Sequence, residues 1–248
     1  MRLSKSWIIA SKDFKTFRKR RQIIYSLVAV PLIVSVLIPL VLDYAGTRKG
    51  GSGIPGPALL ILLPAFIFFF VVLAGYLPTP IASYTLVGEK MEKSLEPLLA
   101  TPTTDSEILL GKGIAAFLPP LGAALGGSVV FMIIMDLVTE STLGYYYFPN
   151  WGTAIELLLL APLAALLSVQ FNVIVSSRVS DVRVAQQLGG LIMLPFGGIY
   201  VAGELNLVPL GNTNTLLSIA GIMAVVVVLM LFVVKATFQR EEILTKWR

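Results

Sequence analysis

Six long apolar runs constrain this chain more than any other feature of its sequence. Each run has about 20 residues with few or no charges, which in a helix is enough to cross the hydrocarbon core of a bilayer. Because backbone polar groups find no water there, such segments must be helical. The predicted membrane helices are 23–42, 58–83, 113–138, 153–175, 188–208 and 215–235.

The composition argues against a water-soluble fold. Hydrophobic residues make up 56% of the chain and charged residues 13%, against roughly 25% charged in a typical soluble domain. The chain has no Cys and no His, so a thiolate metal site and the commonest general base are both missing. We therefore predict an all-α polytopic membrane protein of the plasma membrane, with no metal site and no catalytic residues.

The distribution of Lys and Arg predicts the orientation. Residues 1–22, 85–112, 176–187 and 235–248 hold eight, three, two and four of them, which is 17 of the 19 in the chain. Cytoplasmic segments of membrane proteins are enriched in these residues. Both termini are therefore expected in the cytoplasm. The excess positive charge reflects this topology, so no nucleic-acid partner is expected.

Residues 1–22 have the pattern of an amphipathic helix that lies in the inner membrane interface. The alternative is a solvated basic tail. The charged region and the apolar run that follows are both too long for a cleavable signal peptide, so we expect the segment to be retained. Apolar residues recur at helical spacing, and basic residues occupy the other faces: Leu3, Trp7, Ala10, Phe14 and Phe17 against Lys5, Lys12, Lys15, Arg18 and Lys19.

The loop 85–112 carries much of the charge of the chain. Its stretch "VGEKMEKSLEPLLATPTTDSEILLGK", residues 87–112, holds eight of the 33 charged residues. Ser94 can cap a short helix that Pro102 ends, and Thr104 with Glu107 has the spacing of a capping box that opens the next helix. The short helix places three leucines on one face (Leu95, Leu98 and Leu99). A groove on a partner protein would cover that face, as would the inner ends of the membrane helices or the bilayer surface.

This stretch resembles the signature of type-2 ATP-binding-cassette (ABC) exporter permeases. In that family a Gly-Glu-(Lys/Arg) start leads into "(T/S)LE-LL-TP" and then "EIL-GK" before the third membrane helix. The style of the stretch is closest to the sodium-extrusion and multidrug branch. The residues that match in order are Gly88, Glu89, Lys90, Ser94, Leu95, Glu96, Leu98, Leu99, Thr101, Pro102, Glu107, Ile108, Leu109, Gly111 and Lys112.

The resemblance implies an exporter permease subunit whose residues 94–101 form a coupling helix on a cytoplasmic ATPase. It also implies two ATPase copies, a second permease copy in a homodimer, and an N-terminal elbow helix in contact with membrane lipids. The chain has no P-loop, so ATP and Mg²⁺ are expected on the partner and the chain is not expected to be an enzyme by itself. The implied contacts to the ATPase are Glu89, Ser94, Leu95, Glu96, Pro97, Leu98, Leu99, Thr101 and Pro102, with a second contact at Arg178, Asp181 and Arg183.

Several residues keep more than one interpretation. Arg178, Asp181 and Arg183 would equally suit a solvated turn. Charges at membrane depth often mark transport paths, which makes Asp136, Glu156 and Glu204 candidates for a substrate path, although all three fall near the outer ends of their helices. Gln170 and Asn172 are predicted to form hydrogen bonds between helices. Residues 194–212 would suit a re-entrant hairpin.

The alternative function is a polytopic membrane enzyme that acts on a lipid or peptide. It would need paired catalytic groups, and the three acidic candidates come from three different helices. The sequence does not specify the transported substrate.

Overall fold

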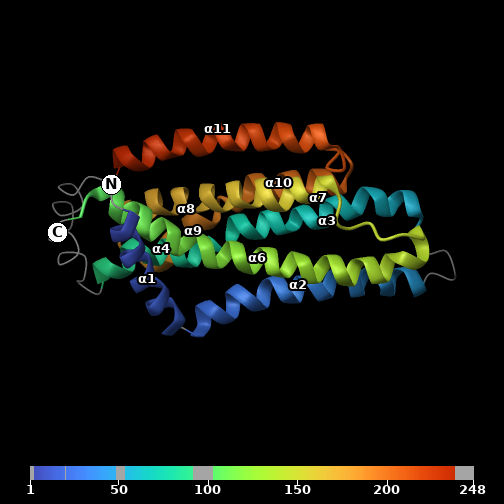
Figure 1. The fold of residues 1–248 in the computed structure, drawn as a ribbon, viewed down its shortest axis with the longest axis horizontal. Helices are drawn as coiled ribbons and strands as arrows, with labels where there is room; N and C mark the ends of the chain where they lie inside the picture. The colour runs from blue at the N-terminus through green and yellow to red at the C-terminus, as the bar shows by residue number, and fades with distance from the viewer. Residues whose placement is uncertain (1–2, 20, 49–53, 92–102, 238–248) are drawn as a thin grey trace.

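The computed structural model describes residues 3–19, 21–48, 54–91 and 103–237, and within these ranges the regular structure is helical. The helices run side by side in one elongated bundle (Figure 1). In chain order they are α1 (Leu3–Lys19), α2 (Arg21–Arg48), α3 (Gly56–Tyr76), α4 (Pro78–Met91), α6 (Asp105–Leu143), α7 (Trp151–Ile155), the π-helix η1 (Glu156–Leu160), α8 (Ala161–Arg178), α9 (Val182–Gly190), α10 (Met193–Glu204) and α11 (Thr213–Thr237).

The prediction of six membrane-spanning helices is confirmed. Six helical stretches of the described chain are long and apolar enough to cross a bilayer. Several are built from consecutive elements, such as α3 with α4 and α7 with η1 and α8. The spans are Ile24–Tyr44, Gly56–Tyr84, Asp105–Leu143, Trp151–Arg178, Val182–Glu204 and Thr213–Thr237.

The bundle has two distinct ends (Figure 1). One holds α1, the start of α6, the connection from α8 to α9 and the last described turn of α11; we call it the basic end. The other holds the connections 144–150 and 205–212; we call it the far end. The segments rich in Lys and Arg therefore gather at one end of the bundle.

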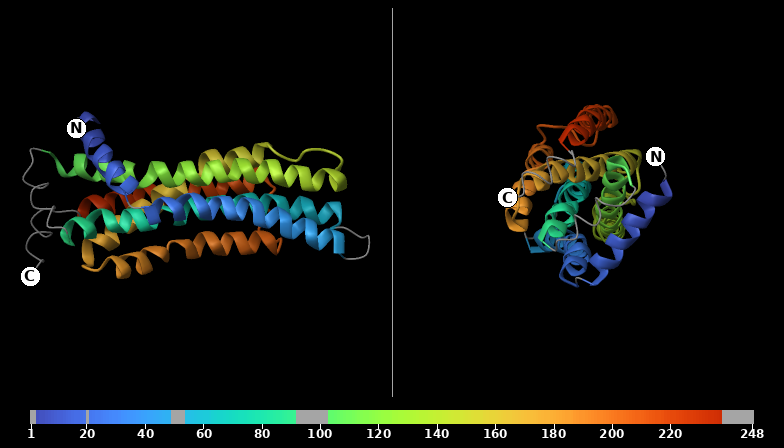
Figure 2. Two further views of the ribbon diagram at one scale, coloured as in Figure 1. Left: turned by 90° about the horizontal axis from the view of Figure 1, so that it is seen from below. Right: turned by 90° about the vertical axis from the view of Figure 1, so that its left-hand side faces the viewer.

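The core is centred on α3, whereas α2 and α11 lie at the periphery. Phe68 and Phe70 of α3 are fully buried, together with Phe131 of α6. Within the most apolar window of each span, 67% of the α3 residues are buried, against 17% in α2 and 22% in α11. Figure 2 shows α11 along the outside of the bundle. The outer faces of α2 and α11 are thus apolar and exposed, as suits contact with lipid or with another membrane helix.

Prolines lie inside several of the membrane spans. Helix α3 ends at Tyr76 and α4 begins at Pro78, with Leu77 between them in a helical conformation. Two adjacent prolines would be expected to interrupt a helix, but α6 continues through Pro119 and Pro120. Membrane helices tolerate such prolines where neighbouring helices support the freed carbonyl groups.

Residues 194–212 do not form a helical hairpin. Their first part belongs to α10, which ends at Glu204, and 205–212 is a non-helical connection with Asn206 in the left-handed region at φ 56°. Helix α11 then begins at Thr213.

Candidate functional site

The start of α6 is fixed by the predicted capping box. The Thr104 hydroxyl accepts a hydrogen bond from the Glu107 amide at 3.3 Å, and the Glu107 carboxylate accepts one from the Thr104 amide at 3.1 Å. Two amides that a helix N-terminus leaves unpaired are satisfied in this way. The helix start therefore lies at a defined position directly after residues 92–102.

The next turn of α6 packs tightly against α1. A Cβ atom on Gly111 would lie 2.6 Å from the Ser6 carbonyl oxygen and 2.9 Å from Cβ of Ile9. No side chain fits at that distance from backbone, so the glycine permits the close approach of the two helices. Ile108, one turn earlier, is fully buried in the same contact region with Ile9 and Ala10. The second half of the stretch 87–112, which includes Ile108 and Gly111, therefore packs against α1.

A buried ion pair joins the same two helices. The Lys112 ammonium lies 3.9 Å from the Asp13 carboxylate, and their side chains are only 2% and 10% exposed. Removing one partner of a buried pair leaves an uncompensated charge, which is costly. The sequence singled out Lys112 as a signature residue without predicting Asp13. The signal for Asp13 was an acidic residue in an otherwise basic amphipathic helix.

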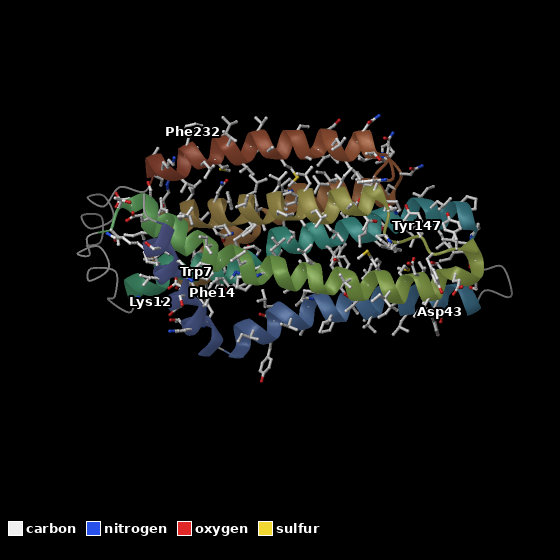
Figure 3. The ribbon with its side chains drawn as sticks, viewed as in Figure 1. Trp7, Lys12, Phe14, Asp43, Tyr147 and Phe232 are labelled. Carbon is white, nitrogen blue, oxygen red and sulfur yellow. The ribbon has the colours of Figure 1, made fainter. Side chains whose placement is uncertain are left out.

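Helix α1 has one face buried against α6 and another that is exposed. Ser6, Ile9, Ala10, Asp13 and Phe17 are buried, and their spacing defines the face that packs on α6. Trp7 and Ile8 remain exposed, and the Trp7 ring lies 6.3 Å from that of Phe14 in an edge-to-face contact. Figure 3 shows Trp7, Phe14 and Lys12 together at the basic end. An exposed aromatic and aliphatic surface next to lysines suits a membrane interface.

The coupling residues predicted at 94–102 lie outside the described residues. Glu89 belongs to α4, although its side chain lies outside the described part of the structure. The segment 92–102 is bordered by α4, which ends at Met91, and by the capping box of α6. Both borders belong to the basic end.

The second predicted contact region is a helix start. The Asp181 carboxylate accepts hydrogen bonds from the amides of Arg183 and Val184, at 2.6 and 3.3 Å. It thereby caps α9, which accounts for an acidic residue at this position. Arg178 and Arg183 are exposed, so the region offers two cations on the surface of the basic end.

A polar cluster joins α4 and α8. The Asn172 amide donates to the Thr79 hydroxyl at 3.3 Å, and its oxygen accepts from the Ser83 hydroxyl at 2.8 Å. Asn172 also packs directly against Gly189 of α9, where a Cβ atom would not fit. The predicted interhelical role of Asn172 is confirmed. Gln170 differs, because its side-chain oxygen is buried without a hydrogen-bond partner in the described structure.

At the far end, Asp136 holds the connection 144–150. Its carboxylate accepts hydrogen bonds from the Tyr147 amide at 3.0 Å and the Phe148 amide at 3.1 Å. Burial, with a smaller contribution from the Glu156 carboxylate, raises the pKa of the Tyr147 hydroxyl above its ordinary value of 10.0. Asp136 has a structural use that the sequence did not indicate.

The other two acidic candidates lie in different surroundings. Glu156 is 1% exposed, begins the π-helix, and has one carboxylate oxygen with no hydrogen-bond partner among the described residues. Glu204 is half-buried, and one of its carboxylate oxygens likewise has no hydrogen-bond partner among the described residues. In the described ranges, no group of three or more acidic side chains is arranged to hold a metal ion. Asp136 accepts a hydrogen bond from the Tyr147 amide, and Glu156 lies close enough to Tyr147 to influence the pKa of its hydroxyl.

Comparisons with known proteins place the chain in a transporter family. Residues 7–208 match the model of a family described as ABC-2 family transporter protein. ABC transporter permease protein NatB of Bacillus subtilis (strain 168) is 26% identical over 238 aligned residues, which cover 84% of this chain and 60% of NatB. The chain thus spans about 60% of the length of this curated relative. The family match begins inside α1 and includes Ile9, Asp13, Gly111 and Lys112 of the α1–α6 contact, while Ser6 lies one residue before it.

Proposed function

Because the chain belongs to the ABC-2 family of transporter proteins, we propose that it is the permease subunit of an ABC exporter driven by a separate ATPase. It is a multi-pass protein of the plasma membrane. The observation that carries the proposal is the contact between α1 and the first turns of α6. Helix α6 begins shortly after residues 94–101, the segment that resembles a coupling helix. In this proposal the basic end faces the cytoplasm and α1 is the elbow helix.

The proposed mechanism is mechanical. ATP-driven closure of two ATPase subunits moves the coupling helix 94–101. The capping box at Thr104 passes this movement to α6, because it fixes the first turn of the helix to the end of the moving segment. The Gly111 contact and the Lys112–Asp13 pair make α1 move with α6. Tilting of the two helices then changes the path through the membrane.

The remaining partners follow from the same proposal. A second copy of the chain forms a homodimer, and the exposed apolar faces of α2 and α11 supply membrane-embedded surface for lipid and for that copy. ATP and Mg²⁺ bind to the ATPase subunits. Arg178 and Arg183 supply a second, smaller contact to the ATPase, supported by their exposure at the basic end.

Co-purification of the chain with its ATPase tests the coupling assignment. Leu98→Asp and Leu99→Asp should each reduce the recovered ATPase strongly, because a buried charge replaces an apolar contact. Leu98→Met is the matched control, since it keeps volume and apolarity, and should leave recovery near wild type. Full recovery of the ATPase with both aspartate variants would contradict docking through this helix.

Glu156 is the acidic residue that best supports a substrate path. It is buried with an unpartnered oxygen in a π-helix, and π-helical turns occur often at functional sites. Glu156→Gln should lower cargo-stimulated ATPase activity of the reconstituted complex and preserve basal activity. Asp136→Asn would instead act through the far-end loop, and Glu204→Gln is the comparison at the third candidate. An equal effect of all three variants would argue against a special role of Glu156.

The membrane-enzyme alternative has less support than the exporter. Asp136 is engaged with loop amides, and the three acidic candidates come from three different helices. Turnover of a lipid or peptide by the purified chain without ATP would favour that alternative. Of the cargo classes, the resemblance of the signature favours sodium or drugs, and transport assays with proteoliposomes would distinguish them.

A further inference from the structure

A cavity of about 390 Å³ lies near the basic end where α6 and α11 both border α8. This volume falls within the roughly 300–1,000 Å³ typical of small-molecule sites. The wall is mainly aliphatic and aromatic, and its apolar lining includes Leu109, Ile114, Phe117, Leu166, Val169 and Leu231. The cavity is thus shaped for the hydrocarbon part of a ligand.

Polar groups occur at two levels of this cavity. Ser106 and Lys235 line the side toward the basic end, and both are exposed. Gln170 lies deeper in the wall, is 7% exposed, and has a side-chain oxygen without a hydrogen-bond partner in the described structure. The lining therefore runs from a cation at the mouth, through one buried amide, to an apolar interior. Such a lining is complementary to an amphiphilic ligand with an anionic head group and an apolar chain.

We propose that the cavity holds one acyl chain of an anionic membrane lipid, with the lipid head group at Lys235. Basic sites between transmembrane helices attract anionic head groups. The Gln170 amide, which is both a donor and an acceptor, would bind an ester or hydroxyl group between head and chain. Access from the bilayer is consistent with α11, whose outer face exposes Phe232 and other large apolar side chains (Figure 3).

The bound lipid would brace the start of α6. Ser106, Leu109 and Leu110 belong to the first two turns of that helix and line the cavity. On the opposite side the same lipid contacts Leu231, Val234 and Lys235 of α11. A lipid therefore links the helix that follows residues 92–102 to a helix that packs mainly on α8. Binding itself does not depend on the ATPase, so it can be tested on the chain alone.

Photo-crosslinking tests the proposal. The purified full chain is reconstituted with a trace of phosphatidylglycerol that carries a diazirine on one acyl chain, and adducts are mapped by peptide mass spectrometry. We expect adducts on the cavity segments of α6, α8 and α11 beyond those on the exposed face of α2. Unlabelled phosphatidylglycerol should displace cavity labelling about fivefold more effectively than phosphatidylcholine, the factor expected for one lysine near an anionic surface.

Two variants and two controls separate the possibilities. Lys235→Gln should remove the preference for phosphatidylglycerol, whereas Lys15→Gln, an exposed lysine on α1, should retain it. Gly113→Leu should fill the cavity and reduce its labelling severalfold, whereas Leu229→Trp on the exposed face of α11 should not. Equal competition by the two lipids in the wild type, or unchanged competition in Lys235→Gln, would overturn the proposal. Because Lys235 is exposed, its variant keeps the test valid even if Gly113→Leu fails to fold.

Discussion

The two ends of the bundle each bury an aspartate but satisfy it in different ways. At the far end, Asp136 binds the amides of a connection only 11 and 12 residues further along the chain. At the basic end, Asp13 faces a lysine of a different helix, far away in sequence. The connection at the far end is thus held by hydrogen bonds between one side chain and backbone amides that are close to it in sequence. The contact between α1 and α6 at the basic end includes a buried charge pair and a close glycine contact between segments far apart in sequence, so single substitutions there can weaken the packing of two helices.

The largest expected effect is at the buried charge pair. Lys112→Met removes one partner of the buried pair with Asp13, and breaking a buried pair in this way costs about 3–5 kcal/mol. Thermal unfolding of the purified protein would measure the loss, and limited proteolysis would show whether α1 is released. Lys15→Met, at an exposed position of α1, is the matched control. The double variant Asp13→Leu with Lys112→Met should recover much of the loss, and a persistent loss in the double variant would contradict the pairing.

Gly111→Ala should come next in size. The added methyl group meets the Ser6 carbonyl at 2.6 Å, and such overpacking costs about 1–3 kcal/mol. Gly113→Ala is the control two residues away, where the nearest atom would be 4.0 Å from the Cβ. Alanine is the better helix former by about 1 kcal/mol, so this variant should be neutral or stabilising. Thermal shifts of the same sign at both positions would refute the close contact with α1.

At the far end, Asp136→Asn should weaken the loop but leave α1 in place. Replacing a carboxylate that accepts two amide hydrogen bonds should cost about 1–3 kcal/mol. Hydrogen exchange at Tyr147 and Phe148 should accelerate, while exchange in α1 stays unchanged. Glu140→Gln, an exposed acidic residue on the same helix, should change neither. Faster exchange in α1 would show that the two ends are not independent.

The smallest expected effect is at the cap of α6. Thr104→Ala removes the hydroxyl that accepts from the Glu107 amide, at a cost of about 1 kcal/mol. Thr104→Ser keeps the hydroxyl and should restore wild-type stability. In the proposed mechanism Thr104→Ala should also reduce cargo-stimulated ATPase activity while ATPase recovery stays normal. A parallel loss of both would place Thr104 in the docking contact itself.

Local features could be predicted from the sequence because they depend on nearby residues. Six apolar runs predicted six spans, and the spacing of Thr104 and Glu107 predicted the capping box. The continuous path of α6 through Pro119-Pro120 was not predicted, because support from neighbouring helices does not show in the sequence.

Contacts between distant segments could not be predicted in the same way. The pattern of α1 suggested an apolar face that includes Trp7, yet the face packed on α6 includes Ser6 and Asp13, and Trp7 is exposed. Periodicity shows that a helix has two faces without showing what covers each. The sequence of α6 likewise does not show which of its glycines contact another helix. A Cβ atom on Gly127 would lie 2.6 Å from Cβ of Pro31 in α2, whereas one on Gly122 or Gly126 would meet no atom within 4 Å.

The length of α6 has a mechanical consequence. Its 39 residues make a rod of about 58 Å, nearly twice the roughly 30 Å of bilayer hydrocarbon. Lys112 sits near one end of this rod and Asp136 near the other, with no break in the helix between them. Pro119 and Pro120 lie between these two residues and each removes one backbone donor from the helix interior. A movement at the basic end would therefore reach the anchor of the far-end loop through one continuous helix, with this proline pair as the place along it where the helix can bend.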